Sequence, residues 1–424
     1  MRKKHFLFAS VLALLCSSST LHAQDFKLTS SGYFKNQGVD VMAFDDIYPE
    51  GHQGGVCIIM NGHRVATNGD IRLEATPGQW QPVPKQLDRK LGDNSITATL
   101  CYPDSSRHLT GFNPMIYPDL HLIYTVNVES KGKNIEVTVD LDRPIPQEFI
   151  GKVGFNLEFF PGSLFGKPWI MDGQSGIFPQ QPNSPLMTTQ PNYLHTGNYH
   201  DGKKSLADMD KLIGKGYSPI VADDIISEPY AKGTKFTSRP DDPYNKVTIE
   251  SLSGDLQLFD GRMNHNNGWF VLRSNIKPGV TKGAVKWIIT PNVVADWMYQ
   301  PVIQTSQIGY HPTQDKEAVI EMDIRDNRKE TAQIIRIDAD GEKVVKNVTP
   351  ANWGKFLRYN YLKVNFTDVK EPGLYKIKYN TSVSPIFRID NDVYARGVWQ
   401  PVLEYFLPVQ MCHMRVNEKY RVWH

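Results

Sequence analysis

Short motifs that mark common enzyme sites are missing from this 424-residue chain. It contains no Gly-rich phosphate loop, no H-E-x-x-H and no G-x-S-x-G. The nucleotide-binding, metalloprotease and esterase classes therefore lose their usual sequence markers.

Cysteine is scarce as well. Beyond Cys16 the chain has Cys57, Cys101 and Cys412, an odd number with no C-x-x-C. Cys57 and Cys101 both lie in strand-like runs, so an exported chain could join them, and two separate buried thiols are the alternative.

The chain also lacks an excess of charge and a long apolar run. Removing Arg2, Lys3 and Lys4 with the N-terminal signal described below takes the 47 basic residues to 44, against 45 acidic residues. Nucleic acid and anionic membranes both favour a basic patch, so this balance argues against either as a partner. No second long apolar segment follows the N-terminal signal, and no membrane span is expected.

The first 23 residues have the order of a secretory signal. A basic start at residues 1–4 precedes an apolar run at residues 6–15 and a polar stretch that ends at Ala23. This order is typical of export, with cleavage leaving Gln24 first. We expect a periplasmic or extracellular protein, and a lipoprotein anchored through Cys16 is the alternative.

Residues 24–300 read as a succession of short strands. Runs of alternating apolar and polar residues, such as 122–128 and 135–141, are separated by Asn-Gly and Pro-Gly turns. This pattern predicts one large β-sandwich, with Trp287 in its core. The proline-rich segment at 178–201 is expected to be a surface loop, either a binding loop or a poorly ordered one.

Residues 301–390 predict a second, smaller sandwich. Alternating runs at 318–323, 332–337 and 362–366 are bounded by turn residues at intervals of roughly ten residues. About 90 residues with this spacing fit an immunoglobulin-like sandwich.

After residue 390 the apolar period changes. Val398, Val402, Phe406 and Val409 recur at three or four residues, which predicts an amphipathic helix from Val393 to about residue 414. Asp392 is expected to cap its start, while Pro401 and Pro408 should kink it. A single helix cannot bury its own apolar stripe, so it either packs on the β units or belongs to a further domain. We expect residues 391–424 to begin a helical domain.

This order of parts resembles the cellulase-type family 9 glycoside hydrolases, which carry an immunoglobulin-like module before a helical catalytic domain. The resemblance covers residues 303–424 and is carried by Gln307-Ile308-Gly309-Tyr310-His311-Pro312, Lys316, Ala318, Pro372-Gly373-Leu374-Tyr375, Phe387 and Ile389. The large β-sandwich predicted at residues 24–300, called the leader domain below, resembles the domain that precedes this module in relatives from Gram-negative polysaccharide degraders. The resemblance is carried by residues 54–56, 80–82, 166–167 and 266–270.

The resemblance implies an inverting hydrolase, in which one carboxylate activates water and another protonates the leaving oxygen. In the family these groups come from a D-A-G-D motif and a distant Glu of the helical domain, an (α/α) barrel. Neither belongs to this chain, for which we predict no catalytic residue. The stretch Asp338-Ala339-Asp340-Gly341 imitates the motif, but its position between two strand-like runs predicts a hairpin turn.

The resemblance also implies a metal site in an intact catalytic domain. Residues 410–414 stand where many family members have Q-R-C-G, and in some of them that cysteine is the first ligand of a structural zinc. Cys412 matches it, but the remaining ligands are absent from this chain, and tetrahedral zinc needs four. We therefore expect no cofactor here, with structural zinc or calcium belonging to the intact catalytic domain.

Aromatic side chains beside polar ones are candidates for sugar contact, because an aromatic ring can stack on the apolar face of a sugar while carboxylates and amides bond to its hydroxyls. The candidates in the leader domain are Trp80, Trp169, Asp172, Asp260, His265 and Trp269. Trp269 could equally fill the sandwich core. Glu158 and Asp172 could be imagined as a glycosidase pair, but the sequence does not place them relative to each other.

Two functions follow. The first is the N-terminal part of an exported, monomeric glycoside hydrolase whose partner is a β-glucan such as cellulose, with the β modules bracing the catalytic helices and extending the glycan-binding surface. The second is a non-catalytic protein that holds glycans at the cell envelope. A hydrolytic leader domain is a third, less favoured, reading.

Overall fold

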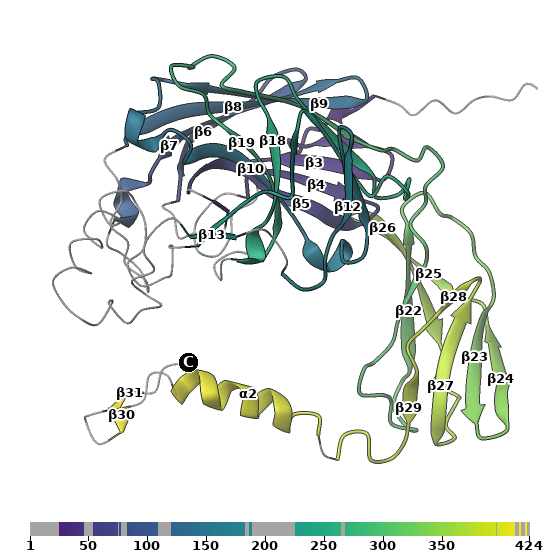
Figure 1. Ribbon diagram of the computed structural model, residues 1–424. Coiled ribbons are helices and arrows are strands. Elements are labelled where there is room, and N and C mark those ends of the chain that lie inside the picture. The colour runs from purple at the N-terminus through teal and green to yellow at the C-terminus, as the bar shows by residue number, and fades with distance from the viewer. Residues whose placement is uncertain are drawn as a thin grey trace, which may run out of the picture. The chain divides into compact units, whose positions relative to one another are not determined.

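The computed structural model describes residues 25–45, 54–74, 76–77, 83–108, 120–182, 186–188, 225–263, 268–395, 397–411, 415–416 and 420–421. The chain forms two compact units, Met1–Trp297 and Met298–His424. Strands dominate both units, and the prediction of a mainly β protein is confirmed (Figure 1).

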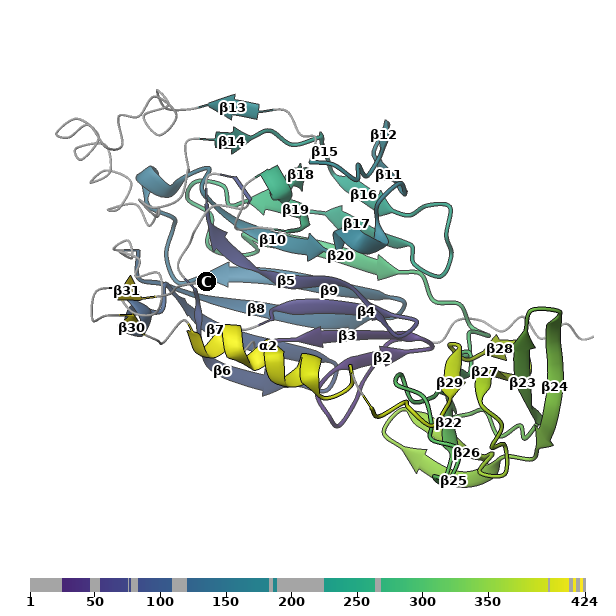
Figure 2. The same cartoon turned by 90° about the horizontal axis from the view of Figure 1, so that it is seen from below.

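The large unit contains two nine-stranded antiparallel sheets. In spatial order the first sheet is β1 (Lys27–Leu28), β2 (Phe34–Asn36), β3 (Val39–Ala43), β4 (Val56–Met60), β5 (His63–Leu73), β10 (Val153–Phe159), β19 (Phe270–Asn275), β18 (Leu256–Asp260) and β15 (Ala231–Gly233). Figure 2 shows strands β2 to β5 of this sheet side by side.

The second sheet runs through β12 (Gln174–Ile177), β11 (Pro168–Met171), β16 (Lys235–Ser238), β17 (Val247–Ser251), β20 (Val285–Pro291), β9 (Asn134–Leu141), β8 (Leu122–Lys131), β7 (Ser95–Tyr102) and β6 (Lys85–Leu91). Four short 3-10 helices lie between strands of this unit, η1 (Ser105–Arg107), η2 (Gln147–Phe149), η3 (Pro161–Ser163) and η4 (Gly261–Met263).

The two sheets of the large unit share one hydrophobic core. Strands β7, β8, β9 and β20 alternate buried and half-buried residues, so each turns one apolar face inward. Trp287 on β20 is fully buried and meets Phe155 of β10 edge to face, with ring centroids 5.0 Å apart. The prediction that Trp287 fills the core is confirmed.

The central strands of the first sheet do not alternate in this way. In β10 every residue is buried, and β5 is buried from Val65 onward. Both faces of these strands are therefore withdrawn from water. One face is apolar and meets the second sheet, while the other carries charged and amide side chains.

The small unit contains a third and a fourth sheet. The third sheet is β21 (Val302–Gln304), β22 (Glu317–Asp323), β26 (Tyr359–Asn365) and β25 (Ala351–Phe356). The fourth is β24 (Gly341–Val348), β23 (Ala332–Asp338), β27 (Gly373–Tyr379) and β28 (Ser382–Val383), with β29 (Phe387–Ile389) also paired to β27. A separate core of sixteen buried residues lies in this unit.

The motif at residues 307–312 has a structural role in the small unit. Gly309 has φ +94°, and a Cβ there would lie 2.2 Å from the Arg388 carbonyl oxygen, so no other residue fits. The Tyr310 hydroxyl donates to the Glu317 carbonyl (3.0 Å) and accepts from the Ser306 amide (3.0 Å). The ring of Tyr310 packs on Phe387, 5.3 Å between centroids.

Lys316 completes this motif from inside the fold. Its side chain is fully buried, and its Nζ donates to the carbonyls of Pro312 (2.8 Å), Gln314 (3.0 Å) and His311 (3.5 Å). Burial lowers the pKa of this amine. The three carbonyls supply the polar partners that a buried ammonium needs.

The helix near the end of the described chain begins later than predicted. Helix α2 spans Gln400–Met411, seven residues after the expected start at Val393. The residue before a proline avoids the helical region, and Pro401 fits only in the first turn. Val393 is buried instead, and Asp392 pairs with Arg388 (2.7 Å). The expected cap at Asp392 is therefore wrong.

Two further strand pairs are short, β13 (Leu186–Thr188) with β14 (Ile225–Ser227) and β30 (Arg415–Val416) with β31 (Tyr420–Arg421). Most of the proline-rich segment at 178–201, the residues of the signal, and Trp80, His265 and Cys412 lie outside the described residues. Among the described residues no helix is long and apolar enough to cross a membrane.

The two described cysteines are not joined. Cys57 lies on β4 of the first sheet and Cys101 on β7 of the second, and no disulfide links them. The Cys57 thiol donates to the Gly54 carbonyl (3.3 Å). Of the two alternatives for this pair, the structure shows separate thiols.

Candidate functional site

The predicted sugar contacts Trp169, Asp260 and Trp269 come together at one end of the large sandwich. The Trp169 ring lies 6.4 Å from that of Tyr230, whose hydroxyl donates to Asp260 Oδ2 (3.0 Å). The Trp269 carbonyl accepts from the Gly261 amide (2.9 Å), beside Asp260. Residues of β11 and β18, and those directly before β15 and β19, are thus linked by a single chain of contacts.

Most of the hydrogen-bonding positions of the Asp260 carboxylate are occupied by partners within the protein. Arg262 holds its carboxylate in two parallel bonds, Nε to Oδ1 (2.8 Å) and Nη2 to Oδ2 (2.9 Å). The guanidinium also lies 4.5 Å from the ring centre of Phe270. Asp260 is fully buried, so in this conformation it fastens the turn after β18 rather than facing a ligand.

The two tryptophans differ in exposure. Trp169 is only 6% exposed and therefore offers no open ring face. Trp269 is half-buried and stands perpendicular to Phe160, with centroids 4.5 Å apart. Of this pair only Trp269 retains a surface that a sugar could reach.

Asp172 serves a turn. It has φ +50°, and its carboxylate accepts from the backbone amides of Thr234 (2.8 Å) and Lys235 (3.0 Å). These bonds tie the end of β11 to the start of β16. The structure thus gives Asp172 backbone partners of its own.

A buried ionic cluster on the outer face of the first sheet was not predicted. It consists of Asp70, Arg72, Glu74, Asn156, Glu158 and Arg273, each less than a tenth exposed. Arg273 donates to Glu74 Oε1 (3.2 Å) and to Asn156 Oδ1 (3.0 Å), and Asn156 donates to Glu74 Oε1 (2.6 Å). The side chains come from β5 and the residue directly after it, from β10 and from β19, because opposite residues of paired strands share a face.

Two tyrosines of the second sheet complete the cluster where β4 ends. Among the described residues the last β4–β5 pair in that direction is Val56 with Gly69, so β4 offers β5 no strand partner beyond it. The Tyr124 hydroxyl donates to Asp70 Oδ1 (2.8 Å), and the Tyr102 hydroxyl accepts from the Leu73 amide (3.1 Å). The Tyr102 hydroxyl therefore accepts an amide bond that a neighbouring strand would otherwise take, while Tyr124 binds a side chain.

Burial raises the pKa of two acids of the ionic cluster, Asp70 and Glu74. It raises the pKa of Asp70 to about 6, against opposing effects of Arg72 and Tyr124. It raises the pKa of Glu74 to about 7, although Arg273 and Asn156 favour the charged form. Such groups can exchange protons near neutrality. They are enclosed in the described conformation, so we assign the cluster a structural role.

The small unit has an open aromatic face, the solvent side of the third sheet. It carries Trp353, Phe356, Tyr359 and Tyr361, with Tyr299 beside them. In β26 the residues Asn360, Leu362 and Val364 are buried, so the alternate tyrosines turn outward. Register pairs Tyr361 with Glu321 and Tyr359 with Asp323, which adds carboxylates to the same face.

Rings of the aromatic face are held by one acid. The hydroxyls of Tyr299 (2.8 Å) and Tyr361 (3.1 Å) both donate to Glu321. Burial and Glu321 raise the pKa of Tyr361, so its hydroxyl remains a donor. Trp353 stands perpendicular to Tyr361 at 5.6 Å. The Trp353 and Tyr361 rings therefore face perpendicular directions, and the Glu321 carboxylate lies beside Tyr361 as a hydrogen-bond acceptor.

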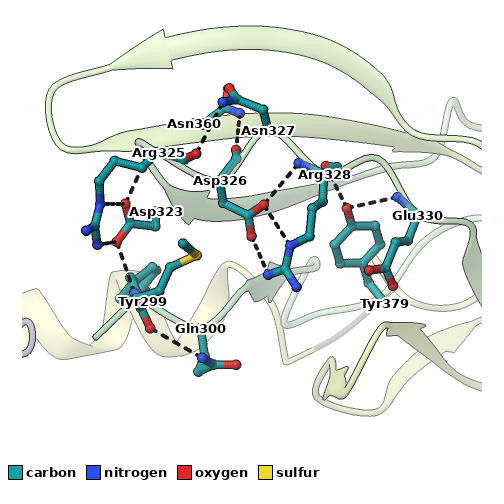
Figure 3. A network of polar contacts seen from close by, with 11 residues as sticks. Tyr299, Gln300, Asp323, Arg325, Asp326, Asn327, Arg328, Glu330, Asn360 and Tyr379 are labelled. Atoms are coloured by element: carbon teal, nitrogen blue, oxygen red, sulfur yellow. Dashed lines mark hydrogen bonds and ion pairs between the residues drawn. The ribbon is translucent and has the colours of Figure 1, made fainter. Parts of the chain in front are cut away.

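Figure 3 shows a loop of paired Asp and Arg residues that reaches Tyr299, the residue beside the aromatic face. Asp323 accepts two side-chain bonds from Arg325, and Asp326 accepts two from Arg328. The Tyr299 amide also donates to Asp323 (3.0 Å). These bonds lower the pKa of Asp323 to about 2, in spite of its burial.

The imitation motif of the small unit is a hairpin. Asp338 pairs with Gly341 across β23 and β24, so only Ala339 and Asp340 form the loop. Gly341 has φ +127°, and Asp338 pairs with Arg336 (2.9 Å). The predicted turn is confirmed. Among the described residues no group of three or more His, Cys, Asp or Glu side chains could hold a metal ion.

Comparison with known proteins matches the small unit to a known type of domain. Residues 298–384 match the cellulase N-terminal Ig-like domain, which corresponds to most of the small sandwich. No curated protein matches the chain. A metagenome-derived glycoside hydrolase family 9 endoglucanase is similar over 21% of this chain and 18% of its own length, at 29% identity and TM-score 0.20.

A second solved structure aligns with a longer part of the chain. The Slr1438 protein from Synechocystis sp. PCC 6803 is similar over 69% of this chain and 100% of its own length, at 10% identity and TM-score 0.29. This chain thus corresponds to only part of the family 9 endoglucanase, since the two align over about a fifth of this chain and less than a fifth of the enzyme.

Proposed function

We propose that this chain is the N-terminal accessory part of a secreted glycoside hydrolase that acts on β-glucans such as cellulose. The observation that carries the proposal is the match of residues 298–384 to the cellulase N-terminal Ig-like domain. Gly309, Tyr310 and Lys316, on which the sequence resemblance rests, hold the small sandwich closed in the structure. The same residues thus account for the likeness and for the fold.

In this proposal the hydrolytic carboxylates lie outside the chain. An inverting enzyme needs two carboxyl groups facing each other across a sugar. Asp338 pairs with Arg336 at a hairpin, Asp260 is fastened by Arg262, and Glu74 is enclosed with Arg273. Each has a partner within the protein, so we assign the chain a bracing and binding role.

The surface of α2 supports the bracing role. Val402, Leu403 and Tyr405 are each more than half exposed. A helix of twelve residues is marginal in water unless an apolar face packs against other structure. We assign α2 to the start of the helical catalytic domain, whose other helices would cover these side chains.

The alternative is a non-catalytic protein that holds glycans at the cell envelope. The observation that favours it is the open aromatic face, which combines exposed rings with hydrogen-bonding groups and needs no catalytic domain to bind a sugar.

Measurement of reducing sugar separates these functions. Residues 25–424 and the complete product of the coding sequence would be purified and incubated with soluble β-glucan. We expect the complete product to extend beyond residue 424 and to release sugar, and residues 25–424 to release none. Glycan binding without turnover by the complete product would support the envelope protein instead. Release by residues 25–300 alone would show that the leader domain is itself a hydrolase.

A further inference from the structure

The open aromatic face of the small unit is composed for a ligand with both apolar and hydroxyl surfaces. Trp353 is 55% exposed and Phe356 is 57% exposed, while Tyr359 and Tyr361 are half-buried. A sugar ring offers C–H bonds on its faces and hydroxyls at its rim, so it can stack on aromatic rings and hydrogen-bond to polar groups beside them.

The position of Trp353 depends on an irregularity in β25. The register with β26 shifts between Asn352 and Gly354, so Trp353 occupies a bulge. Bulges re-aim side chains and are common beside functional sites. Gly354 lies opposite Tyr361, and a Cβ built there would meet nothing within 4 Å. Gly354 has φ +124°, a backbone conformation that favours glycine, and this permits the bulge that places Trp353.

The polar groups of this face continue along β22 and β26. Glu321 accepts from two tyrosine hydroxyls, which leaves further lone pairs on its carboxylate. Lys363 pairs with Glu317 (2.9 Å), and Asn365 lies opposite Glu317 in the register. Glu317 and Asn365 also line a shallow depression with Tyr310 and Asp315. Hydrogen-bonding groups therefore extend away from the rings in one direction.

Charge on the aromatic face favours an uncharged ligand. Lys363 is matched by Glu317 and Arg325 by Asp323. The Arg358 guanidinium lies over the Tyr359 ring, 5.9 Å from its centre. Glu321 adds a negative group at the centre, which would repel a phosphate or an acidic polymer. A protein partner would be expected to meet an interface core depleted of charge. A neutral glycan fits better because its hydroxyls can donate to Glu321.

We infer that the aromatic face around Trp353 and Tyr361 is a binding site for a neutral β-linked glucan chain. This inference rests on the proposed function for the choice of glycan and adds the site. The Trp353 and Tyr361 rings stack on sugar faces, and Glu321 accepts bonds from sugar hydroxyls. The site lies within the Ig-like module and is separate from the sugar contacts predicted in the large unit.

Binding of cellohexaose and of a soluble mixed-linkage β-glucan to residues 25–424 tests the site, by titration calorimetry and affinity electrophoresis. We expect Trp353→Ala and Tyr361→Ala each to weaken binding about fivefold or more, from the loss of a stacked ring. Tyr361→Phe keeps the ring and should lose less. Trp399→Ala removes a tryptophan of similar exposure, 58%, outside this face, and should bind like the unmodified protein.

Each outcome has a separate meaning for the two proposals. Equal binding by the Trp353→Ala, Tyr361→Ala and unmodified proteins would overturn the inference and leave the accessory role intact. If the unmodified protein binds neither glucan, the inference also fails, and the accessory role is judged by reducing-sugar release alone. A concentration-dependent dimer that Trp353→Ala abolishes, without glycan binding, would assign the face to a second copy. Unchanged thermal unfolding of each variant would confirm that it folds.

Discussion

In the large unit Glu74 and Arg273 lie inside the fold with 1% of each side chain exposed, whereas Arg325 and Arg328 of the small unit keep 44% and 51% of theirs exposed. Both arrangements pair an acid with an arginine. The energetic consequences differ, because a buried charge has no water to replace a lost partner. The unfolding free energy of the large sandwich should therefore fall most when an ion pair is broken. That of the small sandwich should fall most when close backbone packing is disturbed.

Arg273→Met should produce the largest effect. At pH 8 the variant leaves Glu74 without its ion-pair partner, and we expect the large unit to lose about 3–5 kcal/mol of unfolding free energy. Urea unfolding followed by tryptophan fluorescence measures the change. The loss should be smaller at pH 5, where Glu74 can take up a proton. Equal losses at both pH values would show that the charge of Glu74 is not the cause.

The small unit should be broken most readily at Gly309. In Gly309→Ala the new methyl group meets the Arg388 carbonyl in a left-handed conformation, and we expect a loss of about 3 kcal/mol. Gly341→Ala is the control within the same unit, since Gly341 has φ +127° and open space around it, and it should cost about 1 kcal/mol. Similar losses in both variants would rule out the steric clash.

The two units should also respond to pH in opposite directions. Glu74 has a raised pKa, so the folded large unit holds a proton that the unfolded chain has already released. The contribution of Glu74 to stability should be fully present below about pH 4.5 and fall by about 3 kcal/mol as pH rises through 7. Asp323 has a lowered pKa, and its contribution should be lost as pH falls from about 4 toward 2.

Unfolding curves between pH 2 and pH 8 would measure both trends, with Glu74→Gln as the matched variant. The amide keeps the shape of Glu74 but cannot titrate, so the fall in stability between pH 4.5 and 7 should shrink. An unchanged slope in Glu74→Gln would assign the response to another group, with Asp70 the next choice.

The smallest effect is expected at the Asp–Arg loop. Arg328→Ala removes a half-exposed partner of Asp326 and should cost about 1 kcal/mol. Asp326 is itself only 2% exposed, but it keeps the bond from the Arg328 amide (3.0 Å), and water can enter where the exposed guanidinium stood. Thermal unfolding of the small unit measures this change. A loss as large as that of Arg273→Met would remove the distinction between the two units.

Elements controlled by local chemistry could be predicted from the sequence. The hairpin at Asp338 and Gly341 follows from two alternating runs with a turn between them. The burial of Trp287 follows from its place in an alternating strand. The match over residues 298–384 agrees with the resemblance that the motif at 307–312 indicated.

Features that depend on contacts between distant strands could not be predicted. Asp70, Arg72 and Glu74 alternate with Ile71 and Leu73, a pattern that normally means one wet face. Here the outer face is buried as well, and the partners on β10 and β19 come from residues far along the chain. The aromatic face was missed for a related reason, because Trp353 and Tyr361 meet only through the shifted register of β25. The sequence also misplaced the start of α2 because the apolar period continues upstream of Pro401.

Lys316 offers a chemical reporter of the small sandwich. Its amine is enclosed by three carbonyls, so reagents that acylate exposed lysines should leave it unmodified while the sheets stay together. Mass spectrometry of the modified peptides would then give the rate at which the domain opens. This readout needs no substrate and can follow the chain on a glycan surface where optical methods fail.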